Sequence, residues 1–320
     1  MARTFLDTVT TPAAARTPIS TSRPIVTLLS DFGARDPSAG IMRAVVLGIC
    51  RDAVIVDLSH EVDKFAVRDG ALLLWCAAPY LPIGAHVAVV DPGVGTARMG
   101  IAIQTARGDY LVGPDNGILM PAAARLGGIV RAHLLEDPSY SLSPVSTSFH
   151  GRDVFAPAAA HLAARLPIER LGRAVDPRRL MELDWPRPEI GPGLLRSHAI
   201  YVDTFGNVKL SALTADLEAA LPGLRPGDQL IVRITDQGGT REVRAQWAVT
   251  FGSVPVGAPL VYGDSYGRSC LALNQGSAAL RYGIEPDAEV TMSRPPGHVA
   301  DGRPPGARPG APRQAASRPI

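Results

Sequence analysis

Strand-like and helix-like segments alternate through the first half of the chain, and this alternation constrains the fold most. The predicted strands are residues 24–30, 53–58, 86–90, 100–105 and 109–112, and the predicted helices are residues 39–50, 67–80 and 154–165. Parallel strands need crossover connections, so this order predicts a mostly parallel α/β sheet with helices packed on it. Ligands of such sheets collect in the crevice outside the carboxyl ends of the strands.

The third predicted strand stops at Asp91, and a tight turn follows it. Pro92, Gly93 and Gly95 favour an irregular turn, because proline fixes φ and glycine adopts positive φ without strain. Arg98 follows Asp91 by seven positions, so the turn can bring the two side chains together. The stretch alone fits either a structural ion pair or part of a binding site.

Other polar side chains also stand at the predicted strand ends of this half. The full set is Asp31, His60, Asp91, Arg98 and His150. Each residue alone fits a structural role, but strand ends in a parallel sheet lie side by side. Together the five residues predict a polar pocket at one edge of the sheet.

The pattern changes after a Pro- and Gly-rich stretch. Short β-rich runs separated by turns follow, at residues 197–203, 229–235, 241–250, 259–262 and 269–274, with one helical segment at 213–220. This pattern predicts a smaller antiparallel β domain. The expected organisation is a disordered lead-in (1–23), an N-terminal α/β domain (24–185), a linker (186–195), a C-terminal β domain (196–292) and a disordered tail (293–320).

Charge, hydropathy and cysteine usage narrow the classes of partner. The net charge of +2 comes from the ends, because residues 1–24 and 293–320 hold eight arginines and two aspartates. The body between them is acidic, which argues against nucleic-acid binding. No apolar run approaches the ~18 residues of a membrane span, and the N-terminus has no secretory apolar region. Cys50, Cys76 and Cys270 lack CxxC spacing, which favours reduced thiols in a cytoplasmic protein.

Several well-known motifs are incomplete or missing. Gly93 and Gly95 match only the first two glycines of GxGxxG, and no GxxxxGK[ST] or GxSxG occurs. Asp31-Phe32-Gly33 has none of the other kinase motifs around it. Asp and His residues are available to a metal, but no HExxH or paired His spacing appears, so no metal site is predicted.

Seven further motifs carry a resemblance to one family. In chain order they are LSDFG (29–33), DLSHE (57–61), VDPGVGT (90–96), GPDNG (113–117), FHGRD (149–153), VDTFGN (202–207) and DSYG (264–267). The chain resembles the S-adenosyl-L-methionine (SAM) hydroxide adenosyltransferases, relatives of the fluorinase and chlorinase, from about residue 25 to 292. The resemblance implies an α/β domain followed by a β-barrel-like domain.

The resemblance also implies a reaction, in which water or hydroxide attacks C5′ of SAM to give adenosine and L-methionine. The nucleophile site of the family falls on Asp91, Arg98 and His150. Halogenases carry other residues at the matching Asp and His positions, so hydroxide chemistry is expected over halide chemistry. A chlorinase-like halide transferase and a non-catalytic SAM- or nucleoside-binding protein stay open as alternatives.

The resemblance further assigns substrate-binding roles. Asp31 would accept hydrogen bonds from the ribose hydroxyls, and Phe65 would cover the ribose side of the pocket. The remaining positions are Asp203 for the methionine ammonium, Ser265 near the amino-acid end, Asn207 at the adenine edge, Phe251 beside the base, and Asn274 near the adenine. Tyr266, also counted in the binding site, and Leu273 stand where the fluorinase has arginines. No cofactor is expected, and the family implies a homotrimer with sites at subunit interfaces.

Overall fold

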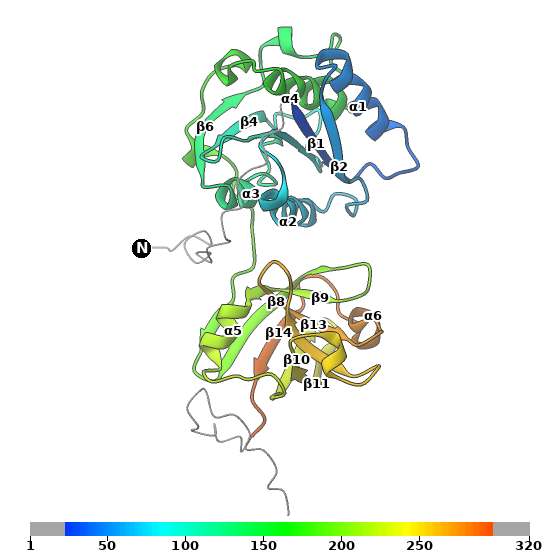
Figure 1. The fold of residues 1–320 in the computed structure, drawn as a ribbon, viewed down its shortest axis with the longest axis vertical. Helices are drawn as coiled ribbons and strands as arrows, with labels where there is room; N and C mark the ends of the chain where they lie inside the picture. Colours follow the sequence, from blue (N-terminus) through cyan, green and yellow to red (C-terminus); the bar gives the residue numbers. More distant parts are fainter. Residues whose placement is uncertain (1–22, 297–320) are drawn as a thin grey trace, which may run out of the picture. The chain divides into compact units, whose positions relative to one another are not determined.

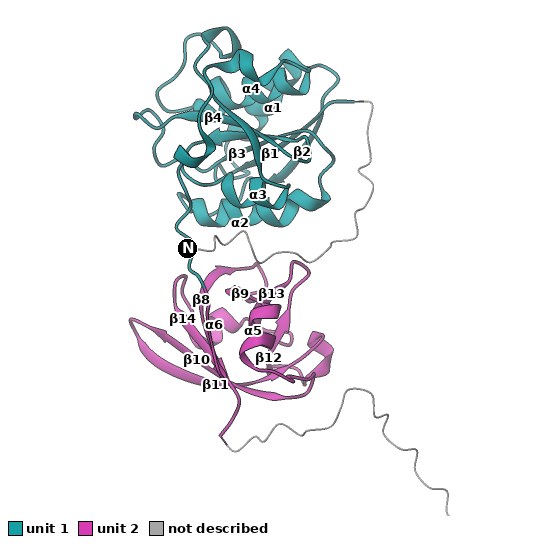
Figure 2. Ribbon diagram, turned by 90° about the vertical axis from the view of Figure 1, so that its left-hand side faces the viewer, with its two compact units in different colours: residues 1–187 teal, residues 188–320 magenta. Residues whose placement is uncertain are grey.

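The computed structural model describes residues 23–296 and separates into two compact units, residues 1–187 and 188–320 (Figure 2). Nearly all of the predicted lead-in, 1–23, and most of the predicted tail, 293–320, lie outside the described residues. Each unit has its own hydrophobic core and is described by itself.

The first unit is built on a six-stranded sheet in the order β2-β1-β3-β5-β4-β6 (Figure 1). The strands are β1 (Ile25–Ser30), β2 (Val54–Ser59), β3 (Ala85–Val89), β4 (Gly100–Thr105), β5 (Tyr110–Pro114) and β6 (Ile129–Leu134). The pairs β1–β2, β1–β3 and β3–β5 are parallel, whereas β4 is antiparallel to both β5 and β6. The predicted α/β class is confirmed.

Helices cover both faces of this sheet (Figures 1 and 2). On one face α1 (Ser38–Ile49) packs against α4 (Ala156–Ala163), and on the other α2 (Val67–Ala77) packs against α3 (Met120–Arg125). Central strands between two helical layers must be apolar on both sides. All six residues of β1 and all five of β3 are accordingly buried.

The second unit is a closed β-barrel of seven strands. The strands are β8 (Leu194–Val202), β9 (Val208–Leu213), β10 (Gln229–Asp236), β11 (Gly239–Trp247), β12 (Pro259–Gly263), β13 (Arg268–Leu273) and β14 (Glu289–Ser293). The barrel closes because the long strand β8 pairs with β14 through its first half and with β9 through its second half. Only β11 and β12 are parallel, so the predicted antiparallel, barrel-like character is confirmed. Two short helices, α5 (Thr214–Ala220) and α6 (Ala278–Tyr282), complete this unit.

The Pro- and Gly-rich residues interpreted as a linker, 186–195, contain a β-hairpin. The short strand β7 (Glu189–Gly191) pairs with the start of β8 across Pro192 and Gly193. Gly193 has a φ of +74°, which a Pro-Gly turn requires at its second central residue. Proline and glycine mark a turn there as well as a change of unit. At the other end, β14 runs to Ser293, the first residue of the predicted tail.

No helix within residues 23–296 is both long and apolar enough to cross a membrane.

Candidate active site

Two neighbouring parallel strands deliver two carboxylates to one edge of the first sheet. Asp31 directly follows β1, and Asp91 comes two residues after β3, with Ser30 and Val89 paired across the strands. Both aspartates line a cavity of about 330 Å³. Phe65 and His150 line the same cavity, so four of the six residues predicted for this half meet there.

Arg98 links Asp91 to His150. Its Nε donates to Asp91 Oδ1 at 3.1 Å, and its Nη2 donates to Asp91 Oδ2. The same Nη2 lies 3.1 Å from His150 Nδ1. The Arg98 and Asp91 side chains are only 9% and 5% exposed, so water screens this pair little. Arg98 itself lines an adjoining cavity of about 290 Å³ that also reaches His150.

These contacts fix the protonation of His150. A guanidinium has donors and no acceptor, so Nδ1 of His150 must accept the hydrogen bond from Arg98. The proton of the neutral ring therefore sits on Nε2. Burial, with the positive charge of Arg98 in second place, lowers the pKa of His150 and outweighs the opposing effect of Asp91 and Asp153. His150 is consequently a neutral ring that donates from Nε2 at neutral pH.

Backbone contacts hold the two loops that carry these side chains. Gly95, in the turn between Asp91 and Arg98, has a φ of +76°, and a Cβ there would lie 2.3 Å from the carbonyl oxygen of Thr147. Only glycine allows this approach. The 146–150 loop is also held by the buried carboxylate of Asp153, which accepts the Ser146 amide at 2.8 Å. Asp153 belongs to the π-helical turn Gly151–Phe155, which begins directly after His150 and leads into α4.

Asp31 is held in place by the loop after β2. Its Oδ2 accepts the backbone amide of Phe65 at 3.0 Å, and its carbonyl accepts the ammonium of Lys64. Phe65 has a φ of +65°, a left-handed conformation that costs a side-chain-bearing residue about 1–2 kcal/mol. Its ring is nevertheless 70% exposed. Strain at an exposed aromatic ring beside a cavity is typical of a ligand-covering residue.

A Ser–His–Asp arrangement lies behind Asp31, but its geometry does not suit nucleophilic attack. Ser30 Oγ is 2.8 Å from His60 Nδ1, and His60 Nε2 is 3.4 Å from Asp57 Oδ1. Ser30 is fully buried, so no substrate reaches its hydroxyl. The same hydroxyl accepts the amide of Phe32 at 3.3 Å. His60, predicted to lie at the pocket, therefore supports the backbone on either side of Asp31 and does not line the cavity.

Several residues that line this cavity were not predicted from the sequence. Asp36, Ser38 and Lys64 line it, as do Phe32 and Phe149. The LSDFG motif is followed by a polar loop and a predicted helix, and this order could have indicated Asp36 and Ser38. An aspartate two residues before the first residue of a helix often accepts a hydrogen bond from the backbone amide of that residue. Here Asp36 Oδ1 accepts the Ser38 amide at 2.9 Å.

The second unit contains a larger cavity, of about 870 Å³, lined by residues of this unit alone. It is lined by all six residues predicted for this half, namely Asp203, Asn207, Phe251, Ser265, Tyr266 and Asn274. Asp203 Oδ1 accepts the amides of Phe205 and Asn207, both at 3.0 Å, and Oδ2 accepts the Asn207 side-chain amide at 2.9 Å. The other side-chain atom of Asn207, Oδ1, is buried and has no hydrogen-bond partner within the described chain.

The structure therefore places the predicted site residues in two sets, one in each unit. Within residues 23–296, no three or more His, Cys, Asp or Glu side chains gather in a way that suits a metal ion.

Comparisons with known proteins agree with this arrangement over both units. Residues 26–172 match the family model described as SAM hydroxide adenosyltransferase N-terminal domain, and residues 197–291 match the corresponding C-terminal domain. A protein of Salinispora arenicola named (R)-S-adenosyl-L-methionine hydrolase is 38% identical over 272 residues, which cover 85% of this chain and 98% of that protein.

Two further relatives are informative. A fluorinase of Actinopolyspora mzabensis is 26% identical over 301 residues, covering 86% of this chain and 99% of the fluorinase. The crystal structure of an uncharacterized conserved protein from Thermotoga maritima superposes with a TM-score of 0.77 at 33% identity, over 84% of this chain and all of that one. The hydrolase is thus clearly more similar to the chain than the fluorinase is.

Proposed function

The chain belongs to the SAM hydroxide adenosyltransferase family, and from this premise we propose that it hydrolyses SAM to adenosine and L-methionine. The observation that carries the proposal is the Asp91–Arg98–His150 cluster, which stands beside Asp31 at one cavity. A water oxygen attacks ribose C5′, the C5′–S bond breaks, and its electron pair stays on sulfur as neutral methionine. The water proton leaves to a base.

The protonation of His150 gives His150 and Asp91 different roles in the cluster. Its Nδ1 is engaged by Arg98, so its Nε2–H is the group that donates to the oxygen of the attacking water. Asp91 then accepts the water proton, because each of its oxygens keeps a second lone pair beyond the one used by Arg98. General base assistance of this kind contributes about 10²–10⁴-fold to rate. Holding the oxygen in line with C5′ adds the advantage of proximity.

The substrate supplies its own activated leaving group. A sulfonium departs as a neutral thioether, so the reaction needs no group to polarise the bond, and we propose that no cofactor takes part. A hydroxide-like oxygen and a sulfonium carry opposite charges that cancel on reaction. A site as little exposed to water as the Asp91–Arg98 pair favours that neutralisation.

The cavity of the second unit suits the base and the amino acid. The buried, unpartnered Oδ1 of Asn207 is an acceptor that matches the amino group of adenine, and binding would satisfy it. Phe251 offers a ring against which the base can pack. Asp203 Oδ2 has acceptor capacity for the methionine ammonium.

The proposal also includes the cellular compartment and the assembly of the protein. Cys50, Cys76 and Cys270 are all buried and none is in a CxxC pair, which suits the reducing cytoplasm as the site of action. A homotrimer with sites at subunit interfaces is the assembly that the family resemblance implies, and light scattering of the purified protein measures it.

The decisive experiment follows the oxygen atom. The purified protein is incubated with SAM in H₂¹⁸O, with and without chloride, and the products are separated by mass spectrometry. We expect adenosine with ¹⁸O at the 5′ position together with methionine, at a rate independent of chloride. Unchanged SAM despite tight binding would instead establish a binding protein, and 5′-chloro-5′-deoxyadenosine would establish a halide transferase.

A further inference from the structure

One cation stands out in the cavity of the second unit. Among the described residues that line it, Lys209 is the one that carries a positive charge, while Asp203 and Asp264 carry negative charges. The two positions where fluorinases have arginines hold Tyr266 and Leu273, which line the same cavity. Whatever binds the carboxylate of an amino acid here must therefore differ from an arginine at those positions.

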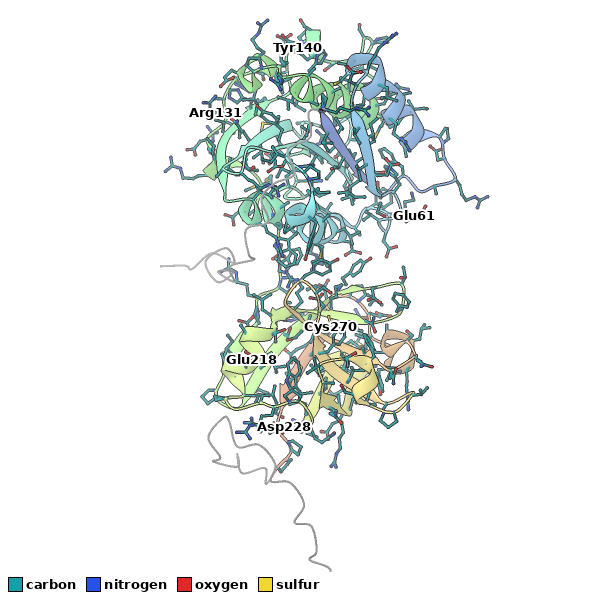
Figure 3. All side chains as sticks on the ribbon, viewed as in Figure 1. Glu61, Arg131, Tyr140, Glu218, Asp228 and Cys270 are labelled. Carbon is teal, nitrogen blue, oxygen red and sulfur yellow. The ribbon has the colours of Figure 1, made fainter. Side chains whose placement is uncertain are left out.

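The position of Lys209 is fixed from two sides. Its Nζ donates to Asp264 Oδ2 at 2.6 Å and lies 5.3 Å from the centre of the Tyr266 ring, within the range of a cation–π interaction. The side chain is only 11% exposed. Lys209 belongs to β9, and its partner across the sheet is Cys270 of β13, which Figure 3 labels. A strand residue locked in this way presents its ammonium at a defined point of the cavity wall.

Asp264 orders the turn that carries the predicted binding residues Ser265 and Tyr266. Its Oδ1 accepts the amides of Tyr266 and Arg268, both at 2.9 Å, while Oδ2 is left for Lys209. The ammonium is therefore bound to Asp264, the residue before Ser265, which the resemblance places at the amino-acid end of the substrate. A lysine ammonium and a serine hydroxyl both donate hydrogen bonds, and a carboxylate accepts them.

Two other ionisable groups on the neighbouring strands β12 and β13, Tyr262 and Cys270, stay neutral. Burial raises the pKa of the Cys270 thiol to about 12, and burial also raises the pKa of the Tyr262 hydroxyl. The lining then carries two negative charges and one positive charge. SAM has the complementary set, with a sulfonium and an ammonium against one carboxylate.

From these observations we propose that Lys209 is the specificity-determining residue that binds the substrate carboxylate in the second-unit cavity. The inference rests on the proposed SAM hydrolysis and deepens it, because it names the group by which the enzyme tells SAM from amines that lack the carboxylate. Lys209 does not touch the reacting carbon in this role. It contributes to binding and leaves the chemical step unchanged.

The test compares SAM with decarboxylated SAM, which has the same adenosyl sulfonium and amine but no carboxylate. We expect the native enzyme to prefer SAM by about tenfold to hundredfold in kcat/KM, the range of a hydrogen bond to a charged group. In Lys209→Met the preference falls to within about threefold, through a higher KM for SAM. Lys209→Arg keeps most of the preference, since it keeps the charge.

The ratio of kcat/KM for the two substrates does not depend on how much of a variant is folded, because a smaller folded fraction lowers both activities equally. Lys209→Met also leaves Asp264 buried without its partner, so the double variant Lys209→Met/Asp264→Asn is measured beside it and should show the same lost preference. Arg233→Met, which removes an exposed ion pair with Glu242 in the same unit, is the matched control and should keep the native ratio.

The outcomes separate the inference from the proposed function. A native preference for SAM in Lys209→Met would overturn the inference while leaving hydrolysis intact, and would mean that Lys209 only supports the 264–267 turn. If the native protein turns over neither compound, the proposed hydrolysis is wrong. The ratio of the two dissociation constants, measured by calorimetry, then takes the place of the ratio of kcat/KM values. A ratio unaffected by Lys209→Met in that binding measurement also overturns the inference.

Discussion

Arg98 donates one hydrogen bond to Nδ1 of His150 over 3.1 Å. Arginine cannot accept hydrogen bonds, so this contact alone decides which nitrogen of His150 carries the proton. In the proposed mechanism the ring therefore donates to the nucleophile, and the carboxylate of Asp91 is left as the base.

The cluster should contribute to turnover more than to binding. Arg98→Lys is expected to lower kcat by about 10²–10⁴-fold with a KM within about threefold of native, because a lysine cannot contact both Asp91 oxygens and His150 together. Steady-state kinetics with SAM measures this. Arg131→Lys alters an exposed arginine paired with Glu169 (Arg131 is labelled in Figure 3) and serves as the control with unchanged kcat. A near-native kcat in Arg98→Lys would remove the guanidinium geometry from the mechanism.

The pH profile should report His150. Its pKa lies below the ordinary value of 6.5, so the neutral ring that Arg98 requires persists through neutral pH and is lost on acidification. We expect kcat/KM to stay level from pH 8 down to about 6.5 and to fall below that value. His161→Gln, at a half-buried histidine of α4 whose pKa is also lowered by burial, should leave the profile unchanged. An acid limb centred above pH 7 would contradict this assignment.

Replacement of Phe65 by glycine should stabilise the protein and weaken substrate binding. Phe65→Gly relieves the left-handed strain and should raise the free energy of unfolding by about 1 kcal/mol, while KM for SAM rises because the exposed ring is lost. Phe65→Ala loses the ring but keeps the strain, so it should raise KM without stabilising the protein. Urea denaturation and initial rates measure the two effects. Equal stability of the glycine and alanine variants would show that φ at this position stores no strain.

A buried network around Asp109, at the opposite end of the strands from Asp31 and Asp91, should make the stability of the protein sensitive to acid. Asp109 is fully buried; burial alone would raise its pKa, but hydrogen bonds from His86 and Arg107 outweigh burial and lower it to about 2. The folded pKa lies below the unfolded value of about 3.9, so the stabilisation is complete above pH 4 and disappears as pH falls toward 2. The loss amounts to about 2 kcal/mol.

Asp109→Asn isolates this contribution. The variant should be less stable at neutral pH by about 3 kcal/mol, because His86 and Arg107 lose a buried partner, and its stability should depend less on pH between 4 and 2. Urea denaturation of both proteins at several pH values provides the comparison. Parallel stability curves for the two proteins would exclude Asp109 as the source of acid sensitivity.

Features set by neighbouring parallel strands were predictable from the sequence. Asp31 and Asp91 end apolar runs that alternate with helices, which predicts parallel strands, and parallel strands bring such ends to one edge. Arg98 followed from the turn after Asp91. His150 is different, because its place depends on the 146–150 loop and on a π-helical turn that local periodicity does not encode.

Other features depend on contacts between residues distant in sequence. The barrel closes through β8 and β14, which are almost one hundred residues apart, and no local pattern encodes that pairing. The Asn207 side chain could be predicted to lie near a ligand only by resemblance, since an asparagine after glycine is also an ordinary turn residue. Asp36 and Ser38 were missed because their cavity position depends on where α1 begins.

The close approach of the Gly95 backbone to the Thr147 carbonyl forms a junction between the two loops that involves no side chain. Exchange of the side chain at position 91 or 150 leaves that junction untouched, whereas insertion of a single residue in either loop would move one member of the cluster away from the other. The architecture thus separates the identity of the reacting groups from their spacing. Descendants of such a protein can acquire a different nucleophile by point mutation, with the distances between loops inherited unchanged.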